Sequence, residues 1–90
     1  MPRILIPSPY RRFTDNESEY RSEGQTVGEA MREFVQMYPA MGQKLLTEEG
    51  QMRSYVHVFI GDRDIRFLRG MNTPVDAETL IRLVPAIAGG

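Results

Sequence analysis

A single stripe of apolar residues at helical spacing constrains the fold of this chain more than any other feature. The stripe consists of six residues at i, i+3, i+4, i+7, i+8 and i+11, namely Val27, Ala30, Met31, Phe34, Val35 and Tyr38. This spacing places them along one face of an α-helix. Thr26 and Glu29 form the pattern of a capping box at its start, and Pro39 and Gly42 predict its end. Because each buried side chain of this kind contributes about 1.5–3 kcal/mol, the stripe requires another layer of structure to cover it.

Apolar segments on both sides of this helix predict that the covering layer is a β-sheet. The predicted strands are residues 3–7, 17–22, 53–60 and 80–84, with 64–66 as a short edge strand. The other segments predict a loop at 8–16, one helical turn at 43–46 and irregular backbone at 70–74. A right-handed crossover through the helix would set the third strand parallel to its partner. The order predicts an α+β protein with the β-grasp architecture: a mixed sheet of four to five strands, the last strand central, and one main helix packed on one face.

Length and charge narrow the class of function. The chain has 90 residues, which predicts one domain, residues 1–85, followed by a flexible C-terminal tail, residues 86–90. The charges of its 11 basic and 12 acidic residues nearly cancel, which argues against nonspecific electrostatic binding of nucleic acid. There is no cysteine for thiolate chemistry, and no apolar stretch approaches the roughly 20 residues of a membrane span. Because the N-terminal apolar run is too short for a signal peptide, we expect a cytoplasmic protein.

The C-terminal segment carries the strongest functional signal. After Pro85, which cannot donate to a sheet ladder and should end strand pairing, come Ala86, Ile87, Ala88, Gly89 and Gly90. Fully extended, this tail reaches about 17 Å at about 3.3 Å per residue. The two glycines lack Cβ atoms, so they fit a narrow channel and leave the terminal carboxyl carbon open to a nucleophile. We therefore expect residues 85–90 to thread into the active site of a partner enzyme; a frayed chain end is the alternative.

A second candidate site lies on the sheet face that points away from the helix. Alternation along two predicted strands places five residues on that face: His57, Phe59, Leu80, Arg82 and Val84. An apolar patch beside the root of the tail favours protein docking over the chance exposure of single apolar residues. We therefore predict that this face binds the enzymes that act on the tail.

The remaining polar residues favour no catalytic, metal or cofactor site. His57 is the only histidine, and no Ser-His-Asp or zinc-ligand set can be assembled from sequence spacing. The acidic residues beside the strands are expected to be solvated: Asp62, Asp64, Asp76 and Glu78. The same expectation holds for two small basic clusters, one of Arg3, Arg11 and Arg12 and one of Arg63, Arg66 and Arg69.

Two segments carry a resemblance to a known family. The ending, residues 83–90, and the segment 56–67 resemble the C-terminus and the central strand-turn-strand segment of the MoaD/ThiS family of ubiquitin-like sulfur-carrier proteins. The Asp-Ile-Arg-Phe run and the Pro-Ala-Ile-Ala-Gly-Gly ending are most similar to the CysO-type branch, which serves cysteine biosynthesis. One departure is Asp76-Ala77-Glu78, where the family often has Asp-Gly-Asp. If that turn needs a positive φ, Ala77 would be strained.

The resemblance implies a carrier that is a substrate of partner enzymes and not itself an enzyme. A ubiquitin-activating-type adenylyltransferase would use ATP and magnesium, which this chain does not bind, to adenylate the Gly90 carboxylate. Sulfide, or the persulfide of a sulfurtransferase, would then displace AMP and leave a thiocarboxylate on Gly90. In the CysO-type branch the acceptor is an activated serine on a cysteine synthase, and a JAMM-type metallopeptidase releases the cysteine.

Three alternatives stay open on the sequence alone. The sulfur could instead serve molybdopterin, thiamin or another thio-metabolite. The chain could be a ubiquitin-like modifier joined to other proteins through Gly90, although Lys44 is its only lysine, which argues against chain building. It could also be a plain interaction domain with an inert tail.

Overall fold

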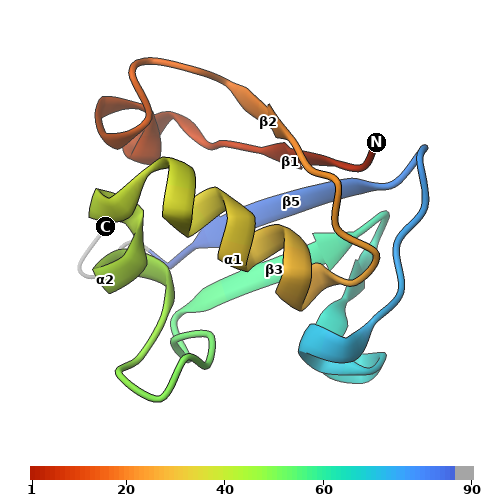
Figure 1. The fold of residues 1–90 in the computed structure, drawn as a ribbon. Helices are drawn as coiled ribbons and strands as arrows, with labels where there is room; N and C mark the ends of the chain where they lie inside the picture. Colours follow the sequence, from red (N-terminus) through yellow and green to blue (C-terminus); the bar gives the residue numbers. More distant parts are fainter. Residues whose placement is uncertain (87–90) are drawn as a thin grey trace.

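The computed structural model describes residues 1–86, in which one long helix lies across one face of a β-sheet (Figure 1). The strands are β1 Arg3–Leu5, β2 Glu19–Arg21, β3 Val56–Ile60, β4 Arg63–Asp64 and β5 Leu80–Pro85. The α-helices are α1 Val27–Met37 and α2 Gly42–Leu45, and the short 3-10 helices are η1 Ser8–Phe13, η2 Pro39–Met41, η3 Ile65–Phe67 and η4 Gly70–Asn72. The predicted α+β class and the predicted order of the main elements are confirmed.

The sheet within residues 1–86 has five strands in the order β2-β1-β5-β3-β4, so the last strand is central, as predicted. β1 is parallel to β5, and the other neighbouring pairs are antiparallel. The prediction that the third strand lies parallel to its partner is therefore wrong. The crossover through α1 does join two strands of the same direction, β2 and β3, but β1 and β5 lie between them. The parallel pair is formed instead by the first strand and the last.

The core lies between α1 and the inner face of the sheet. The predicted stripe supplies its helical half, because four of its members are completely buried: Val27, Ala30, Met31 and Phe34. The strands supply the other half through Ile4, Val56, Val58, Ile81 and Leu83. The ring of Phe34 lies 5.7 Å from that of Tyr20 and 5.5 Å from that of Tyr38, measured between centroids. These aromatic contacts join α1 to the β2 edge of the sheet.

The start of α1 is capped almost as predicted. The side-chain oxygen of Thr26 accepts a hydrogen bond from the backbone N–H of Glu29 at 3.1 Å, which confirms the N-cap. The carboxylate of Glu29 accepts from the N–H of Gln25 at 2.9 Å, one residue before the partner that a capping box predicts. Tyr38 caps the end of the helix, but Gly42 is not a stop signal, since it is the first residue of α2.

Other segments also differ from the sequence expectation. Residues 8–13 form η1 where a loop was expected, and Tyr10 is buried there. The third strand begins at Val56, later than the predicted start at residue 53. The short edge strand ends at Asp64, and the chain then turns into η3 because the Asp64 carboxylate accepts a hydrogen bond from the N–H of Arg66 at 2.9 Å.

The turn before β5 is closed by side-chain hydrogen bonds and needs no glycine. The Asp76 carboxylate accepts from the N–H of Glu78 at 2.9 Å and from the hydroxyl of Thr79 at 3.0 Å. These bonds lower the pKa of Asp76, the bond from Glu78 most. Apart from glycines, only Asp15 and Asn16 have a positive φ within residues 1–86, so Ala77 is not strained.

Candidate functional site

The segment predicted as the tail begins at the end of the central strand. Pro85 is the last residue of β5 and pairs with Val56 of β3. The next residue, Ala86, donates its backbone N–H to the carbonyl oxygen of Tyr55 at 2.8 Å. Pairing therefore continues one hydrogen bond beyond Pro85, because the missing N–H of proline does not prevent its neighbour from donating. The other predicted tail residues, namely Ile87, Ala88, Gly89 and Gly90, lie outside the described residues.

A groove lies beside this root. Its lining includes Pro85 and Ala86 together with Tyr10, Lys44 and Tyr55, around a volume of about 410 Å³. The Lys44 ammonium lies 4.3 Å above the centroid of the Phe13 ring, a cation–π contact. The only lysine of the chain is therefore next to the point from which the tail departs. Sequence analysis did not place it there, because α2 and β5 are far apart along the chain.

The structure brings the five residues of the predicted docking face together. Strand register places His57 opposite Val84 and Phe59 opposite Arg82, with Leu80 two residues along β5. Because the alternate residues of β3 and β5 point into the core, these five point away from α1. The guanidinium carbon of Arg82 lies 5.5 Å from the centroid of the Phe59 ring. Leu80 and Val84 are both exposed, so the docking face has an apolar centre with a cation on it.

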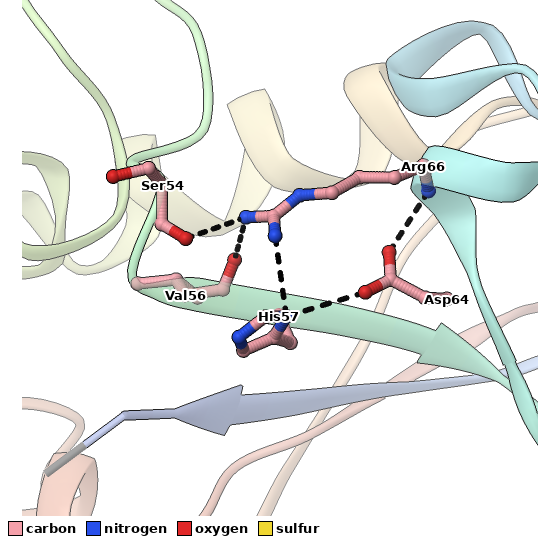
Figure 2. Close-up of polar contacts among 5 residues, drawn as sticks. All are labelled: Ser54, Val56, His57, Asp64 and Arg66. Carbon is pink, nitrogen blue, oxygen red and sulfur yellow. Dashed lines mark hydrogen bonds and ion pairs between the residues drawn. The ribbon is translucent and has the colours of Figure 1, made fainter.

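A polar cluster borders the docking face on its β4 side (Figure 2). His57 Nδ1 lies 3.2 Å from Asp64 Oδ2, and Asp64 Oδ1 accepts from the backbone N–H of Arg66 at 2.9 Å. The Arg66 guanidinium reaches back over β3. Its Nη2 donates to the carbonyl oxygens of Ser54 at 2.7 Å and Val56 at 3.1 Å, and its Nη1 lies 3.3 Å from His57 Nδ1. Arg66 thus connects η3 to the start of β3 and to the segment just before it.

Only one of the two contacts at His57 Nδ1 can be a hydrogen bond at a time. A guanidinium can only donate and an ionised carboxylate can only accept. Nδ1 must therefore carry a proton to bond Asp64, or lack one to bond Arg66. The backbone N–H of Arg66 lowers the pKa of Asp64, and the contacts from His57 and the Arg66 charge act in the same direction against the opposing effect of burial. Asp64 is the fixed negative charge of the cluster.

Replacing Asp64 with Asn should destabilise the protein in a pH-dependent manner. Because the folded-state pKa of Asp64 lies below its unfolded value, its carboxylate stabilises the fold at pH values above about 3.9 and loses this effect as the pH falls through the folded-state pKa. Urea unfolding should show wild type more stable than Asp64→Asn near pH 7, with the gap shrinking toward about pH 2. A gap of equal size at both pH values would contradict this account.

The other polar candidates do not form a site. Asp76 is bound within its own turn, and Arg3 pairs with Glu19 at 3.3 Å. Arg11 donates to the carbonyl oxygen of Ile6 at 3.1 Å, so it is also engaged locally. Within residues 1–86, no three histidine or acidic side chains lie close enough to hold a metal ion. No helix in the same range is long and apolar enough to cross a membrane.

One exposed residue was missed by sequence analysis. Phe67, the last residue of η3, exposes 85% of its surface. No periodic pattern flags a single phenylalanine at the end of a 3-10 turn, so the sequence carried no signal for its exposure. The segment that resembles the sulfur-carrier family ends at this residue.

A helix across a mixed five-stranded sheet, with the last strand central and leading into the tail, defines a small ubiquitin-like protein of the β-grasp class. The chain belongs to the ThiS family, whose model matches residues 4–90. The sulfur carrier protein CysO of Mycobacterium tuberculosis is 25% identical over 89 residues, covering 97% of this chain and 96% of that protein. The small archaeal modifier protein 3 of Haloferax volcanii is 31% identical over 65 residues, covering 72% of this chain and 70% of that protein.

The fold comparison agrees with the sequence comparison. A chain in the crystal structure of the Amycolatopsis orientalis BexX/CysO complex matches this structure with a TM-score of 0.89 and 27% identity, covering 100% of both chains. This chain is therefore a small ubiquitin-like protein of the ThiS/CysO type. Proteins of this type are substrates of partner enzymes, and the chain is not itself an enzyme.

Proposed function

We propose that this chain is a sulfur carrier that is loaded on the carboxylate of Gly90. The observation that carries the proposal is the root of the tail. The central strand ends in a pair between Pro85 and Val56, and the Ala86–Tyr55 hydrogen bond extends it by one residue. A terminal segment that starts from so fixed a base can be directed into a partner's active site while the domain itself stays folded. The match to the ThiS family, which extends to Gly90, supports the same assignment.

The proposed loading has two steps, both on partner enzymes. In the first, an oxygen of the Gly90 carboxylate attacks the α-phosphorus of magnesium-bound ATP, and pyrophosphate leaves. In the second, sulfide attacks the acyl carbon and AMP leaves, so that a carbon–oxygen bond is replaced by a carbon–sulfur bond. If the sulfur comes from the persulfide of a sulfurtransferase, a thiol must reduce the resulting disulfide. The carrier supplies the carboxylate and its position, and the partners supply the ATP, the magnesium and the sulfur.

Cysteine biosynthesis is the pathway that we propose for the sulfur. The support is the likeness to carriers named CysO, at 25% identity to the mycobacterial protein and 27% in the Amycolatopsis complex. The acceptor would then be an activated serine bound to a cysteine synthase in the cytoplasm. A JAMM-type metallopeptidase would release the cysteine and restore Gly90. Molybdopterin, thiamin or another thio-metabolite are the alternative destinations.

A second candidate function, protein modification, has one specific observation in its favour. The small archaeal modifier protein 3 is 31% identical to this chain. A modifier would form an isopeptide bond between Gly90 and a lysine of a target. Polymers of this chain could be built only through Lys44 or the α-amino group, because no other lysine is present.

Intact mass separates these functions. The purified chain is incubated with ATP, magnesium, sulfide and an adenylyltransferase of the ubiquitin-activating type. A sulfur carrier gains the mass difference between one sulfur and one oxygen atom, whereas a modifier gives higher-mass conjugates with target proteins. A chain that stays unmodified with its activating enzyme would refute both functions and leave a plain interaction domain.

The docking face gives a separate prediction. Phe59→Asp should raise the dissociation constants for the activating enzyme and the acceptor enzyme at least about tenfold, because it places a charge in the apolar centre of the face. The fold should be unchanged, since Phe59 points away from the core. Isothermal calorimetry measures binding, and circular dichroism checks the fold. Met37→Asp is the matched control, because Met37 is also an exposed apolar residue but lies at the end of α1; equal binding by both variants would defeat the assignment.

A further inference from the structure

Phe67 is the most exposed large apolar side chain among residues 1–86, at 85% against 58% for Met37, the next most exposed. Exposed single apolar residues are ordinary on protein surfaces. A nearly fully exposed aromatic ring is a different case when the backbone under it is fixed. Such a ring is pre-organised for a partner and loses little conformational freedom when it binds.

The backbone under Phe67 is fixed from both sides. Asp64 caps η3 by accepting the N–H of Arg66, and the N–H of Leu68 bonds the carbonyl oxygen of Ile65 at 2.9 Å. Ile65 is buried in the core, and Leu68 packs against it. Phe67 therefore lies between two anchored neighbours and points into solvent.

The 3-10 helix η3, which carries Phe67, is also hydrogen-bonded close to the root of the tail. The Arg66 guanidinium donates to the carbonyl oxygen of Val56 (Figure 2), and Val56 is the strand partner of Pro85. The same guanidinium bonds the carbonyl oxygen of Ser54 at 2.7 Å. A protein that holds Phe67 would therefore hold the departure point of the tail in a defined orientation.

The charged residues close to Phe67 in the sequence indicate the chemistry of the partner surface that would bind it. Arg63 and Arg69 are exposed on either side of it along the chain, and no ion pair within residues 1–86 involves either of them. Of the two nearest acidic residues in sequence, Asp64 is engaged by His57 and Arg66, and only Asp62 is exposed. An exposed aromatic ring flanked in sequence by two exposed arginines complements an apolar pocket with carboxylates at its edge.

We propose that Phe67 anchors a second contact, separate from the docking face, with the enzyme that adenylates the tail. The ring enters an apolar pocket of that enzyme, and Arg63 and Arg69 pair with carboxylates at the pocket's rim. This inference rests on the proposed function and adds the chemistry of the partner surface to it. The contact adds affinity to the complex in which the tail reaches the ATP site.

The test is the rate of ATP–pyrophosphate exchange by the activating enzyme as a function of carrier concentration. Phe67→Ala should raise the KM for the carrier about tenfold or more with little change in kcat, because the reacting tail is intact. Phe67→Leu, which keeps an apolar side chain, should recover most of the loss. Met37→Ala, at the next most exposed apolar position, should behave as wild type.

The charged rim has its own test in the same assay. The double variant Arg63→Glu with Arg69→Glu should raise KM strongly at about 0.05 M salt and much less at about 0.5 M, since salt screens exposed charges. Arg21→Glu is the control, because β2 is the opposite edge of the sheet from β4. A loss that is the same at both salt concentrations would overturn the proposed rim.

The outcomes separate this inference from the proposed function. If wild type supports no exchange with its activating enzyme, the proposed function fails. If wild type supports exchange and Phe67→Ala keeps the wild-type KM, the anchor alone is refuted. Sedimentation of wild type and Phe67→Ala tests the other occupant, a second copy of the chain: a dimer lost only in the variant, with KM unchanged, would assign Phe67 to self-association and overturn the proposal.

Discussion

Deletion of Gly90 is expected to lower loading of the carrier by at least about a hundredfold while leaving the stability of the domain unchanged. The new terminus is again a glycine carboxylate, so its chemistry is preserved and only its position changes. It falls short by about 3.3 Å. A misplacement of about 1 Å at a reacting centre can already cost about a hundredfold in rate. The loss should therefore appear in kcat for adenylation, whereas the docking face still binds.

Two measurements check this result. Pyrophosphate exchange reports adenylation, and thermal unfolding reports the stability of the domain. Gly90→Ala is the matched control, because it keeps the length of the tail and adds one methyl group. A narrow channel should tolerate the added methyl group poorly. Because the tail keeps its full length, however, Gly90→Ala should stay measurably active and lose less activity than the Gly90 deletion. Wild-type loading of the shortened chain would refute the mechanism.

Replacement of Phe34 with Ala should have the largest effect on stability, about 3–5 kcal/mol. Phe34 is completely buried, and its ring contacts those of Tyr20 and Tyr38. Removing the ring leaves a cavity between α1 and β2, beside Tyr20 and Tyr38. Since small domains are stable by only about 5–15 kcal/mol, the variant should be partly unfolded near body temperature.

The midpoint of urea unfolding measures this loss. Met37→Ala, one turn further along α1 on its exposed side, should change stability by less than about 0.5 kcal/mol. If Phe34→Ala costs less than about 1 kcal/mol, the packing of the helix on the sheet has been misjudged. The same pair of variants separates loss of the fold from loss of partner binding in the loading assay.

The sequence predicted the features that depend on local patterns. The spacing of the stripe from Val27 to Tyr38 fits only an α-helix and defines a single apolar face, so it predicted both the helix and its buried side. Strand alternation placed Phe59, Leu80 and Val84 on one face, because a strand has only two faces. The tail was predicted from residue types alone, and its root at Ala86 is the only part of residues 86–90 within the described structure.

The features that the sequence did not predict depend on contacts between distant residues. The direction of β3 relative to its neighbour depends on where β5 inserts, which no local pattern records. Arg66 was expected to be solvated, but the turn after β4 aims its guanidinium at two carbonyl oxygens of residues ten and twelve positions earlier. The same turn leaves Phe67 exposed. Such contacts depend on the exact path of a short turn, and side-chain type alone does not specify that path.

The hydrogen bond between Ala86 and Tyr55 sets a limit on the geometry of any enzyme that uses this carrier. In the proposed mechanism the reacting group is the carboxylate of Gly90, four residues beyond Ala86, and four extended residues span at most about 13 Å. The ATP site must therefore lie within that distance of the carrier's body when the two proteins are bound. A deeper catalytic centre could not be reached, however tightly the surfaces adhered. The length of the tail thus selects, among enzymes that could bind the domain, those whose catalytic centre lies close to the binding surface.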